Sequence, residues 1–302
     1  MDFGIRFGEH VVQARREGRP VVALESTIVS HGLPRPDNLR VAREVEQTVR
    51  DNGAVPATIG MIGGLLVVGL SADQLEHLAL ADNVAKLSVR DLAVAAATGA
   101  DGATTVAATS AIAAAAGIGV FATGGLGGVH RDATVTYDES ADLTTLARTP
   151  IVVVCAGVKS ILDVGATLER LETLGVTVAG YRTRRFPGFF VTDGGFDVDW
   201  SLDSPAGVAA AMAARAAQGV TSGALILANP LPPDQQLDPA LHDRTLAEGL
   251  ARLADKRITG KAVTPFLLAH FHEATHGQSL AVNTRVILNN AALAARIATA
   301  TP

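Results

Sequence analysis

Ionisable side chains follow several apolar, strand-like runs of this chain. Glu25 comes directly after the run 21–24, and Lys159 comes shortly after the run 150–156. Further polar residues beside similar apolar segments are Lys86, Asp138, Ser140 and Asp142. Ligands of α/β proteins bind at the carboxyl ends of strands, so several such residues at successive strand ends indicate an enzyme site better than any one does. A lysine there can attack a carbonyl carbon and a glutamate can deliver a proton, whereas a single surface lysine would need no function.

The segment 272–276, His-Glu-Ala-Thr-His, matches the signature of zinc proteases, in which two histidines one helical turn apart bind zinc and the glutamate acts as a base. Such a site needs a third ligand, and the sequence from Gly277 to Pro302 has no His, Asp, Glu or Cys. Gly277 also favours the end of a helix directly after the second histidine. A zinc metalloprotease acting through His272 and His276 is therefore a minor hypothesis, and a solvated helix end is the preferred interpretation.

A glycine-rich stretch, residues 123–130, follows the apolar run 118–122. Paired glycines after a strand let backbone N–H groups approach a phosphate. The spacing differs from the dinucleotide-binding pattern, and residues 132–138 are predicted to be extended rather than helical, so a Rossmann site is not favoured. On its own, the stretch fits a surface turn as well as a ligand-binding loop.

Composition limits the class of protein. With 302 residues, 48% hydrophobic and 18% charged, the chain can bury a large core and is neither disordered nor fibrous. A net charge of −5 does not suit a surface that binds long nucleic acid. Cys155 is the only cysteine, which excludes an intrachain disulfide and favours a cytoplasmic location. The longest apolar stretch, residues 59–70, contains four glycines and is shorter than the roughly 20 residues that span a bilayer.

Apolar runs alternate with alanine-rich amphipathic segments, the pattern of a layered α/β fold. Strands are predicted at 21–24, 57–62, 65–70, 118–122, 150–156, 176–180 and 223–228, with a hairpin between the second and third. Helices are predicted at 38–51, 88–98, 101–116, 160–174, 204–218, 239–256 and from 264 onward. No linker divides the chain, so we expect one domain over residues 1–302, an α/β/α sandwich around a mixed, mostly parallel sheet.

Eight segments in fixed order resemble the pseudouridine-5'-phosphate glycosidases, a family also called indigoidine synthase A-like. The longer ones are ALESTIVSHGLP at 23–34, DGATTVAAT at 101–109, FATGGLGGVHR at 121–131, CAGVKSILD at 155–163 and GKAVTPFLL at 260–268. The shorter ones lie at 55–59, at 84–86 with 90–92, and at 140–143. Together they extend over nearly the whole chain, which makes the resemblance far more specific than any single motif.

This resemblance implies reversible cleavage of the C–C glycosidic bond of pseudouridine 5'-phosphate, giving uracil and ribose 5-phosphate. It implies a divalent metal, typically Mn²⁺, and a homotrimer. By the same resemblance, Lys159 corresponds to the nucleophile that attacks C1' of the ribose, Glu25 to the proton donor and Asp138 to the metal ligand. The implied substrate-binding positions are Lys86, Val106, Thr123, His130, Ser140, Ala141 and Asp142.

The reaction explains why these residue types are needed. Ordinary glycosidases use two carboxylates and protonate an electronegative leaving atom, but here the leaving atom is a uracil carbon. A lysine that opens the ribose and holds C1' as an imine-type adduct supplies an electron sink beside the bond that breaks. Glu25 can then protonate the uracil carbon, for which burial should raise its pKa while the charge of Lys159 opposes that shift.

A few positions depart from the family pattern. They are Glu139 beside Asp138, Arg184 and Arg185 in place of an acidic pair, His276-Gly277 in place of two glycines, and Thr284-Arg285 after Asn283. None of them replaces Glu25, Lys86, Asp138 or Lys159, so we expect activity to be retained. A noncatalytic nucleotide-binding module is the other alternative, and a turnover measurement separates it from an enzyme.

Overall fold

The computed structural model describes residues 4–301, apart from the side chain of Lys261. Within this range, eleven strands form one central sheet. They are β1 (Arg6–Phe7), β2 (Val21–Leu24), β3 (Val55–Ile62), β4 (Leu65–Val68), β5 (Ala85–Leu87), β6 (Gly102–Thr104), β7 (Val120–Ala122), β8 (Val152–Cys155), β9 (Thr177–Tyr181), β12 (Trp200–Leu202) and β13 (Leu225–Ala228). A separate pair, β10 (Arg185–Phe186) and β11 (Phe196–Asp197), forms a small antiparallel hairpin.

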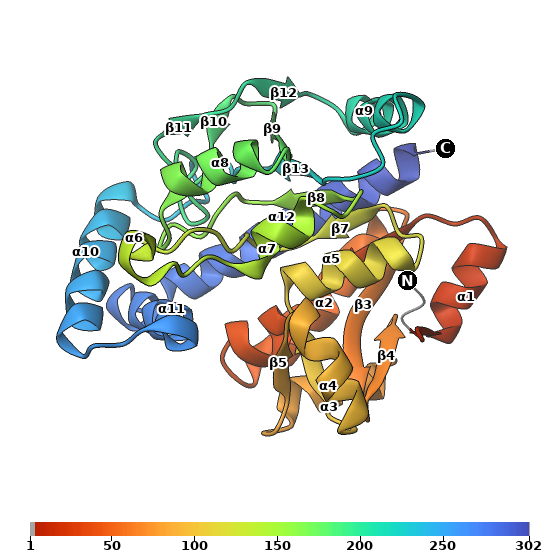
Figure 1. The fold of residues 1–302 in the computed structure, drawn as a ribbon, viewed down its shortest axis with the longest axis horizontal. Coiled ribbons are helices and arrows are strands. Elements are labelled where there is room, and N and C mark those ends of the chain that lie inside the picture. The colour runs from red at the N-terminus through yellow and green to blue at the C-terminus, as the bar shows by residue number, and fades with distance from the viewer. Residues whose placement is uncertain (1–3, 302) are drawn as a thin grey trace.

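The helices cover both faces of this sheet (Figure 1). They are α1 (Glu9–Arg16), α2 (Asp37–Asp51), α3 (Ala72–Leu80), α4 (Leu92–Ala97), α5 (Val106–Ala115), α6 (Ala133–Thr136), α7 (Ala141–Leu146), α8 (Val164–Thr173), α9 (Pro205–Ala217), α10 (Pro239–Asp255), α11 (Val263–Ala274) and α12 (Gln278–Ala300). A turn of π-helix (Ile28–Gly32) follows β2.

The main path of the sheet has the order β1-β4-β3-β2-β7-β8-β13-β9-β12, and β6 joins β5 to β3. The pairs β3–β4 and β3–β6 are antiparallel, while the other pairs of this sheet are parallel. The predicted mixed, mostly parallel sheet is confirmed, including the hairpin of β3 and β4.

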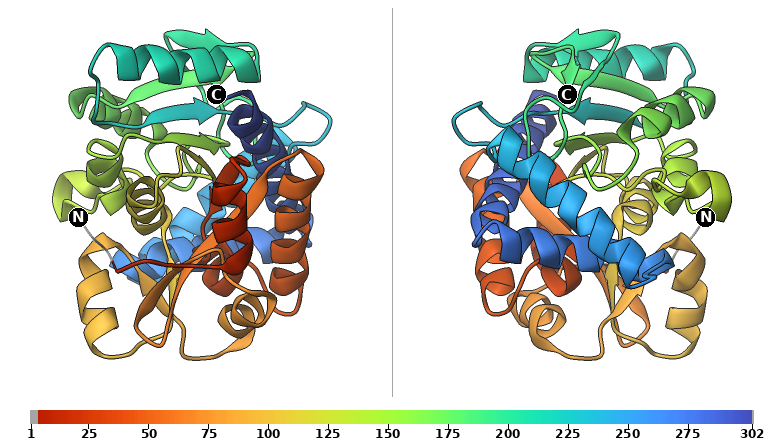
Figure 2. Two further views of the ribbon diagram at one scale, coloured as in Figure 1. Left: turned by 90° about the vertical axis from the view of Figure 1, so that its right-hand side faces the viewer. Right: turned by 90° about the vertical axis from the view of Figure 1, so that its left-hand side faces the viewer.

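Side chains along the central strands point alternately to the two faces of the sheet, and a layer of helices covers each face. On β2, Val22 and Leu24 belong to the core that α2 and α12 cover, whereas Ala23 faces the core that contains residues of α1 and α5. The residues of β8 alternate in the same way between the two cores. Successive strand side chains point to opposite faces, so a run that is apolar at every position is buried on both sides. The side views in Figure 2 show helices on both sides of the strands, and the expected α/β/α sandwich is confirmed.

Four predicted elements need correction. Residues 101–116 are not one helix, because Gly102–Thr104 pairs with β5 and β3 as β6 before α5 begins. The segment 132–138 is not extended and contains the short helix α6. The helix predicted from Ser160 begins only at Val164, because the Asp163 side chain accepts a hydrogen bond from the Ala166 N–H and caps α8. The C-terminal segment forms two helices, since His276 and Gly277 adopt left-handed backbone conformations between α11 and α12.

Cys155 is buried at the end of β8, as the sequence predicts. Burial raises the pKa of its thiol to about 12, so the reactive thiolate is disfavoured near neutral pH. This cysteine is therefore a core residue rather than a nucleophile. As for membranes, none of the helices described in residues 4–301 has the length and hydropathy needed to cross a bilayer.

Candidate active site

The order of the strands brings the predicted catalytic residues together. The neighbouring parallel strands β2, β7 and β8 end at the same edge of the sheet. Glu25 directly follows β2, Thr123 directly follows β7, and Lys159 lies in the turn after β8. Chain segments separated by more than a hundred residues thus meet at the carboxyl edge of the sheet, where α/β enzymes bind their ligands.

Glu25 is buried, with 9% of its surface exposed, and the Thr123 hydroxyl donates a hydrogen bond to its carboxyl group. Burial raises the pKa of Glu25, while the positive charge of Lys159 and the Thr123 hydrogen bond oppose this shift. The direction predicted from the sequence is confirmed. A carboxyl group with a raised pKa keeps its proton at a higher pH, which suits a proton donor.

Lys159 lies in a turn rather than at the start of a helix, which corrects the sequence-based interpretation. Its Nζ donates to the carbonyl of Gly125 at 2.5 Å, and its backbone N–H donates to the Leu126 carbonyl at 3.2 Å. The glycine-rich loop after β7 therefore binds both the side-chain amine and the backbone N–H of Lys159. A Cβ at Gly125 would come within 3.0 Å of the Phe189 ring, so a glycine allows the close packing of this loop.

Two adjoining cavities open at this edge, with volumes of about 160 Å³ and about 390 Å³. Both are lined by Glu25, Thr27, Lys86, Lys159 and Thr264. The larger one is also lined by Val106, His130, Asp138, Ser140, Ala141 and Asp142. All the predicted site residues except Thr123 thus line a cavity, and the buried Thr123 lies against Glu25. The structure thus brings these residues together around two adjoining cavities.

Asp142 connects three segments around the larger cavity. Its carboxylate accepts hydrogen bonds from the N–H of Ala107 at 2.9 Å and from the N–H of Gly127 at 2.8 Å. Asp142 therefore links α7 to the first turn of α5 and to the glycine-rich loop. A Cβ at Gly127 would collide with the side chains of Ser140 and Asp142, so this glycine is required for close approach.

Asp138 is the expected metal ligand. Its side chain is 32% exposed, lines the larger cavity and lies 3.8 Å from Nδ1 of His130. The neighbouring Glu139 is paired with Arg170 at 3.0 Å. Among the described residues, no group of three His, Cys, Asp or Glu side chains could enclose an ion. One partly exposed carboxylate fits a hard divalent ion that keeps most of its water ligands, as Mg²⁺ often does.

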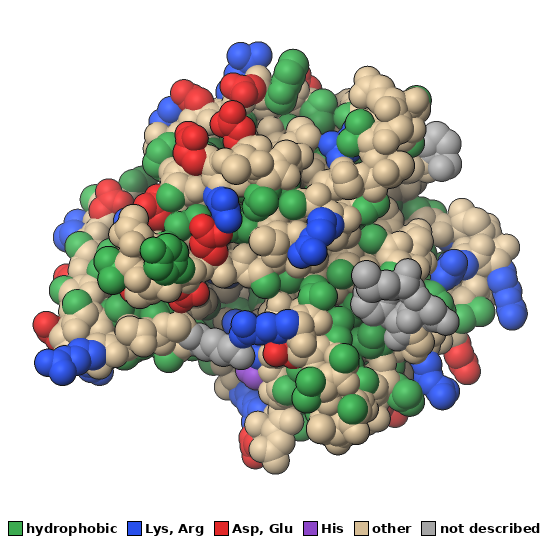
Figure 3. Space-filling view, in the orientation of Figure 1, with side chains coloured by type: hydrophobic (Ala, Val, Ile, Leu, Met, Phe, Trp, Pro, Cys, Tyr) green, Lys and Arg blue, Asp and Glu red, His purple; other side chains and the backbone are tan. Residues whose placement is uncertain are grey.

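The larger cavity carries charge of both signs. Lys86 and Arg90 line it together with Asp138 and Glu139. On the face of the molecule in Figure 3, Lys and Arg side chains are likewise interspersed with Asp and Glu. This distribution offers positive charge for a phosphate and negative charge for a metal ion within one cavity.

The zinc-protease hypothesis receives no support. Helix α11 ends at Ala274, and His276 adopts a left-handed conformation outside it, so the two histidines do not share one helix. Both histidines are exposed, and no third metal ligand joins them within the described part of the chain.

Sequence reasoning missed several residues of the smaller cavity, namely Thr27, His31, Phe189 and Asn283. Thr27 Oγ1 and Asn283 Oδ1 are buried without a hydrogen-bond partner in the structure. Burial and the charge of Lys86 lower the pKa of His31. Thr27 and His31 lie inside the segment 23–34 that resembles the family, so this motif could have indicated them. Asn283 comes from α12, and its position in the sequence gave no signal.

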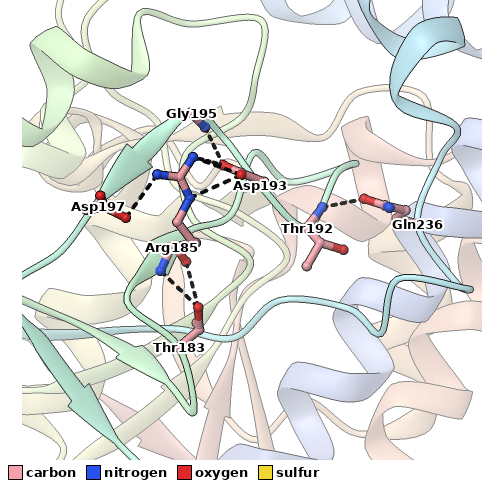
Figure 4. Close-up of polar contacts among 7 residues, drawn as sticks. All are labelled: Thr183, Arg185, Thr192, Asp193, Gly195, Asp197 and Gln236. Carbon is pink, nitrogen blue, oxygen red and sulfur yellow. Dashed lines mark hydrogen bonds and ion pairs between the residues drawn. The ribbon is translucent and has the colours of Figure 1, made fainter.

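Phe189 lies on the loop between β10 and β11. Arg185, at the start of this loop, binds two carboxylates near its other end (Figure 4). The Arg185 guanidinium binds the Asp193 carboxylate at 2.8 Å and the Asp197 carboxylate at 3.0 Å. The backbone N–H of Thr192 donates to the Gln236 side chain at 2.7 Å. Arg185, which departs from the family pattern, thus has a local structural role in the loop that forms one wall of the smaller cavity.

Comparison with known proteins gives consistent matches. A family model described as indigoidine synthase A like protein matches residues 10–300. A pseudouridine-5'-phosphate glycosidase of Salinispora tropica is 77% identical, with 99% of this chain and 92% of that protein covered. A pseudouridine-5'-phosphate glycosidase of Saccharopolyspora erythraea is 59% identical, with 96% and 95% covered.

Solved structures give the same result. The prealnumycin C-glycosynthase AlnA, in complex with ribulose 5-phosphate, matches with a TM-score of 0.90 and 38% identity over 98% of this chain and 96% of that one. An indigoidine synthase A-like protein of Thermotoga maritima matches with a TM-score of 0.87 and 33% identity. The match covers 97% of this chain and 95% of that one. The two relatives described above, at 77% and 59% identity, are pseudouridine-5'-phosphate glycosidases. This chain therefore belongs to the indigoidine synthase A-like family.

Proposed function

We propose that this enzyme reversibly cleaves the C–C glycosidic bond of pseudouridine 5'-phosphate to uracil and ribose 5-phosphate. The observation that carries the proposal is a buried glutamate with a raised pKa beside a lysine on the same cavity, Glu25 and Lys159. The 77% identity to a pseudouridine-5'-phosphate glycosidase supports the choice of substrate, and so does a structural neighbour that forms C-glycosides and was solved with a sugar phosphate.

The first step that we propose is opening of the ribose by Lys159, after its ammonium group has lost a proton to solvent and become an uncharged amine. Its amine forms a bond to C1', the bond between C1' and O4' breaks, and O4' takes the proton that the amine loses. The hydrogen bond to the Gly125 carbonyl holds Nζ near the cavity wall before substrate arrives. Positioning of this kind removes much of the entropic cost of bringing two groups together.

Breakage of the C–C bond follows. The Glu25 carboxyl group protonates C5 of uracil, and the electron pair of the bond between C1' and C5 then remains on the departing uracil. The nitrogen of Lys159 supplies electrons to C1', which leaves an iminium ion on the lysine. Water hydrolyses this ion to ribose 5-phosphate, and the released proton returns to Glu25.

The two cavities divide the substrate between them in this proposal. Lys86 and the first turn of α5, beginning at Val106, would bind the phosphate in the larger cavity, because a cation and a helix N-terminus both favour anions. The smaller cavity would hold uracil against Phe189 and Asn283. Asn283 is 7% exposed and its Oδ1 has no partner in the structure, so it can accept a hydrogen bond from an imide N–H of uracil.

We predict that Asn283→Ala raises KM for pseudouridine 5'-phosphate about 10-fold, since one hydrogen bond to a buried neutral group is worth roughly 1 kcal/mol or somewhat more. Steady-state kinetics of uracil release measure this. Binding of ribose 5-phosphate alone should not change, because that product lacks the base. An equal loss of affinity for ribose 5-phosphate would contradict the assignment of Asn283 to uracil.

A divalent ion, for which Mn²⁺ is our expectation, would be held by Asp138 with water as its other ligands. When bound, it supplies positive charge that balances the substrate phosphate. We predict that Asp138→Ala increases the Mn²⁺ concentration needed for half-maximal activity at least about 10-fold. Electron paramagnetic resonance of Mn²⁺ measures binding independently of turnover. Unchanged Mn²⁺ binding in the variant would exclude Asp138 as the ligand.

A homotrimer and a cytoplasmic location complete the proposal. An apolar groove of about 770 Å³, lined by Leu65, Val89, Leu92, Ala93 and Ala96 among others, supports self-association, because a second copy could cover it. Sedimentation velocity would test the trimer. The single buried cysteine supports a reducing compartment, which cell fractionation would test.

The proposed function is tested by measuring uracil release from pseudouridine 5'-phosphate with Mn²⁺ present. We expect turnover with the phosphorylated substrate and much slower release from pseudouridine, which lacks the phosphate that Lys86 would bind. A folded protein that binds the substrate but releases no uracil would refute the proposal and favour a noncatalytic binding module.

A further inference from the structure

A buried histidine outside both cavities is hydrogen-bonded to the residue next to Lys159. His242, near the start of α10, is 5% exposed, and its Nε2 lies 2.7 Å from the hydroxyl oxygen of Ser160. Its Nδ1 lies 2.9 Å from the carboxylate of Asp243. The mechanism above makes no use of this chain of three side chains, of which only Ser160 lies in a segment that resembles the family, 155–163.

The direction of the hydrogen bonds follows from their partners. A carboxylate only accepts, so the Nδ1–H of a neutral His242 donates to Asp243. Nε2 and the Ser160 hydroxyl form a hydrogen bond in either protonation state of the ring, because a hydroxyl can both donate and accept. The ring packs against Phe271 of α11 at a centroid distance of 5.6 Å and against Phe190 at 6.5 Å. These rings keep water away from the contact and fix the orientation of the imidazole.

The arrangement of Ser160, His242 and Asp243 has the composition of a hydrolytic triad, but its surroundings exclude that role. Ser160 is only 5% exposed and is not among the residues that line either active-site cavity. A nucleophilic serine must reach its substrate, and this hydroxyl instead points to a buried ring. The contact is therefore suited to fixing the position of Ser160.

The turn that carries Lys159 needs such contacts because it is not part of a helix or strand. The Arg131 guanidinium donates to the carbonyl oxygens of Ser160 at 3.0 Å and of Ile161 at 3.3 Å. These bonds hold the backbone of the turn, whereas His242 holds the side chain of Ser160. Helix α10, which carries His242, packs against α11, and α11 contributes Thr264, Pro265 and Leu268 to the smaller cavity.

We propose that His242 is a positioning residue: through Ser160 it fixes the turn of Lys159, and it connects that turn to α10, which packs on the cavity-lining helix α11. The inference rests on the proposed role of Lys159 as nucleophile. A small displacement of a nucleophile can reduce the rate about 100-fold without affecting the groups that bind substrate. His242 should accordingly influence kcat and adduct formation more than KM.

The test compares His242→Phe, His242→Gln, Ser160→Ala and the double variant His242→Phe with Ser160→Ala. Phenylalanine keeps the packing against Phe190 and Phe271 but removes the hydrogen bond, while the amide of glutamine can replace Nε2. We expect His242→Phe and Ser160→Ala each to reduce kcat by about 10-fold or more, with KM within about 3-fold of the wild type. The double variant should be no slower than either single variant, because both substitutions remove the same hydrogen bond. His242→Gln should retain most of the wild-type rate.

His270 offers a control. It is also buried, and its Nε2 lies 3.1 Å from the Thr245 carbonyl of α10, so it joins the same two helices without contacting the turn. His270→Gln should reduce thermal stability but leave kcat near the wild-type value. If it reduced kcat as much as His242→Phe does, the effect would come from general loosening of the helix pair and the proposal would be overturned.

Trapping with borohydride and ribose 5-phosphate tests the role of Lys159 as nucleophile separately from the positioning role of His242. If the wild type forms no trapped adduct on Lys159, the proposed mechanism fails, and the inference about His242 fails with it. If the wild type forms the adduct and His242→Phe forms it equally fast, only the inference fails. If His242→Phe does not fold, Ser160→Ala takes its place, because it removes the same hydrogen bond. Slower adduct formation in Ser160→Ala than in His242→Gln would support the inference, and equal rates would overturn it.

Discussion

Lys159→Ala should abolish uracil release, with a reduction in kcat of at least about 10³-fold. Without the amine, C1' has no group that can form the iminium ion, and the electron pair of the C–C bond has no driving force to move to uracil. Borohydride with ribose 5-phosphate should add a reduced sugar phosphate to the wild type but not to the variant. Intact-mass measurement and peptide mapping detect the adduct and its position.

Lys86→Ala is the matched control, since Lys86 is a second lysine that lines the same two cavities. We expect this variant to have a higher KM but still to form the trapped adduct, because phosphate binding and nucleophilic attack are separate roles. Turnover by Lys159→Ala within about 10-fold of the wild type would exclude this lysine as the nucleophile. Adduct formation at Lys86 instead of Lys159 would reverse the assignment.

Glu25→Gln should reduce cleavage about 10²- to 10⁴-fold, the usual contribution of a general acid. Glutamine has nearly the same shape and can still accept the hydrogen bond from Thr123, but it cannot protonate C5 of uracil. The variant should still form the trapped adduct with ribose 5-phosphate, because no uracil carbon is protonated in that step and solvent can supply the proton that it needs. Loss of both reactions would point to a structural defect rather than to a missing proton donor.

The pH dependence of cleavage follows from the raised pKa of Glu25. Cleavage needs the protonated carboxyl group, so kcat in this direction should fall as pH rises through the pKa of Glu25 in the enzyme–substrate complex. The residual kcat of Glu25→Gln should not show this decrease as pH rises. Synthesis needs the carboxylate and should have the opposite dependence on Glu25. A cleavage profile that is identical in the two proteins would exclude Glu25 as the group that limits the rate at high pH.

Stability should depend on the same ionisation. Because the pKa of Glu25 is higher in the folded than in the unfolded chain, its contribution to stability is fully present below the unfolded pKa and is lost as pH rises through the folded pKa. Thermal denaturation across a pH series should therefore show Glu25→Gln gaining stability relative to the wild type as pH increases. The cause is that glutamine remains uncharged in the buried position.

Much of the fold was readable from local patterns, and each error has an identifiable physical cause. The apolar runs predicted β2, β8 and β13 because strands buried on both faces are apolar at every position. The segment 101–116 was predicted as one helix because alanine and threonine dominate it. Pairing of Gly102–Thr104 with β5 and β3 overrides that preference, and only the sheet supplies those partners. Similarly, the cap at Asp163 moves the start of α8 beyond Lys159.

The sequence by itself determined the residue types of the site, the family motifs that contain them and the position of Glu25 at a strand end. The tertiary structure decided which strand ends are neighbours, because the order β2-β7-β8 depends on pairing between β2 and β7, which lie about a hundred residues apart. It also decided that Asn283 of α12 reaches the smaller cavity and that His242 reaches Ser160. Such contacts depend on how helices pack on a completed sheet, and packing between distant segments leaves no periodic or local pattern in the sequence.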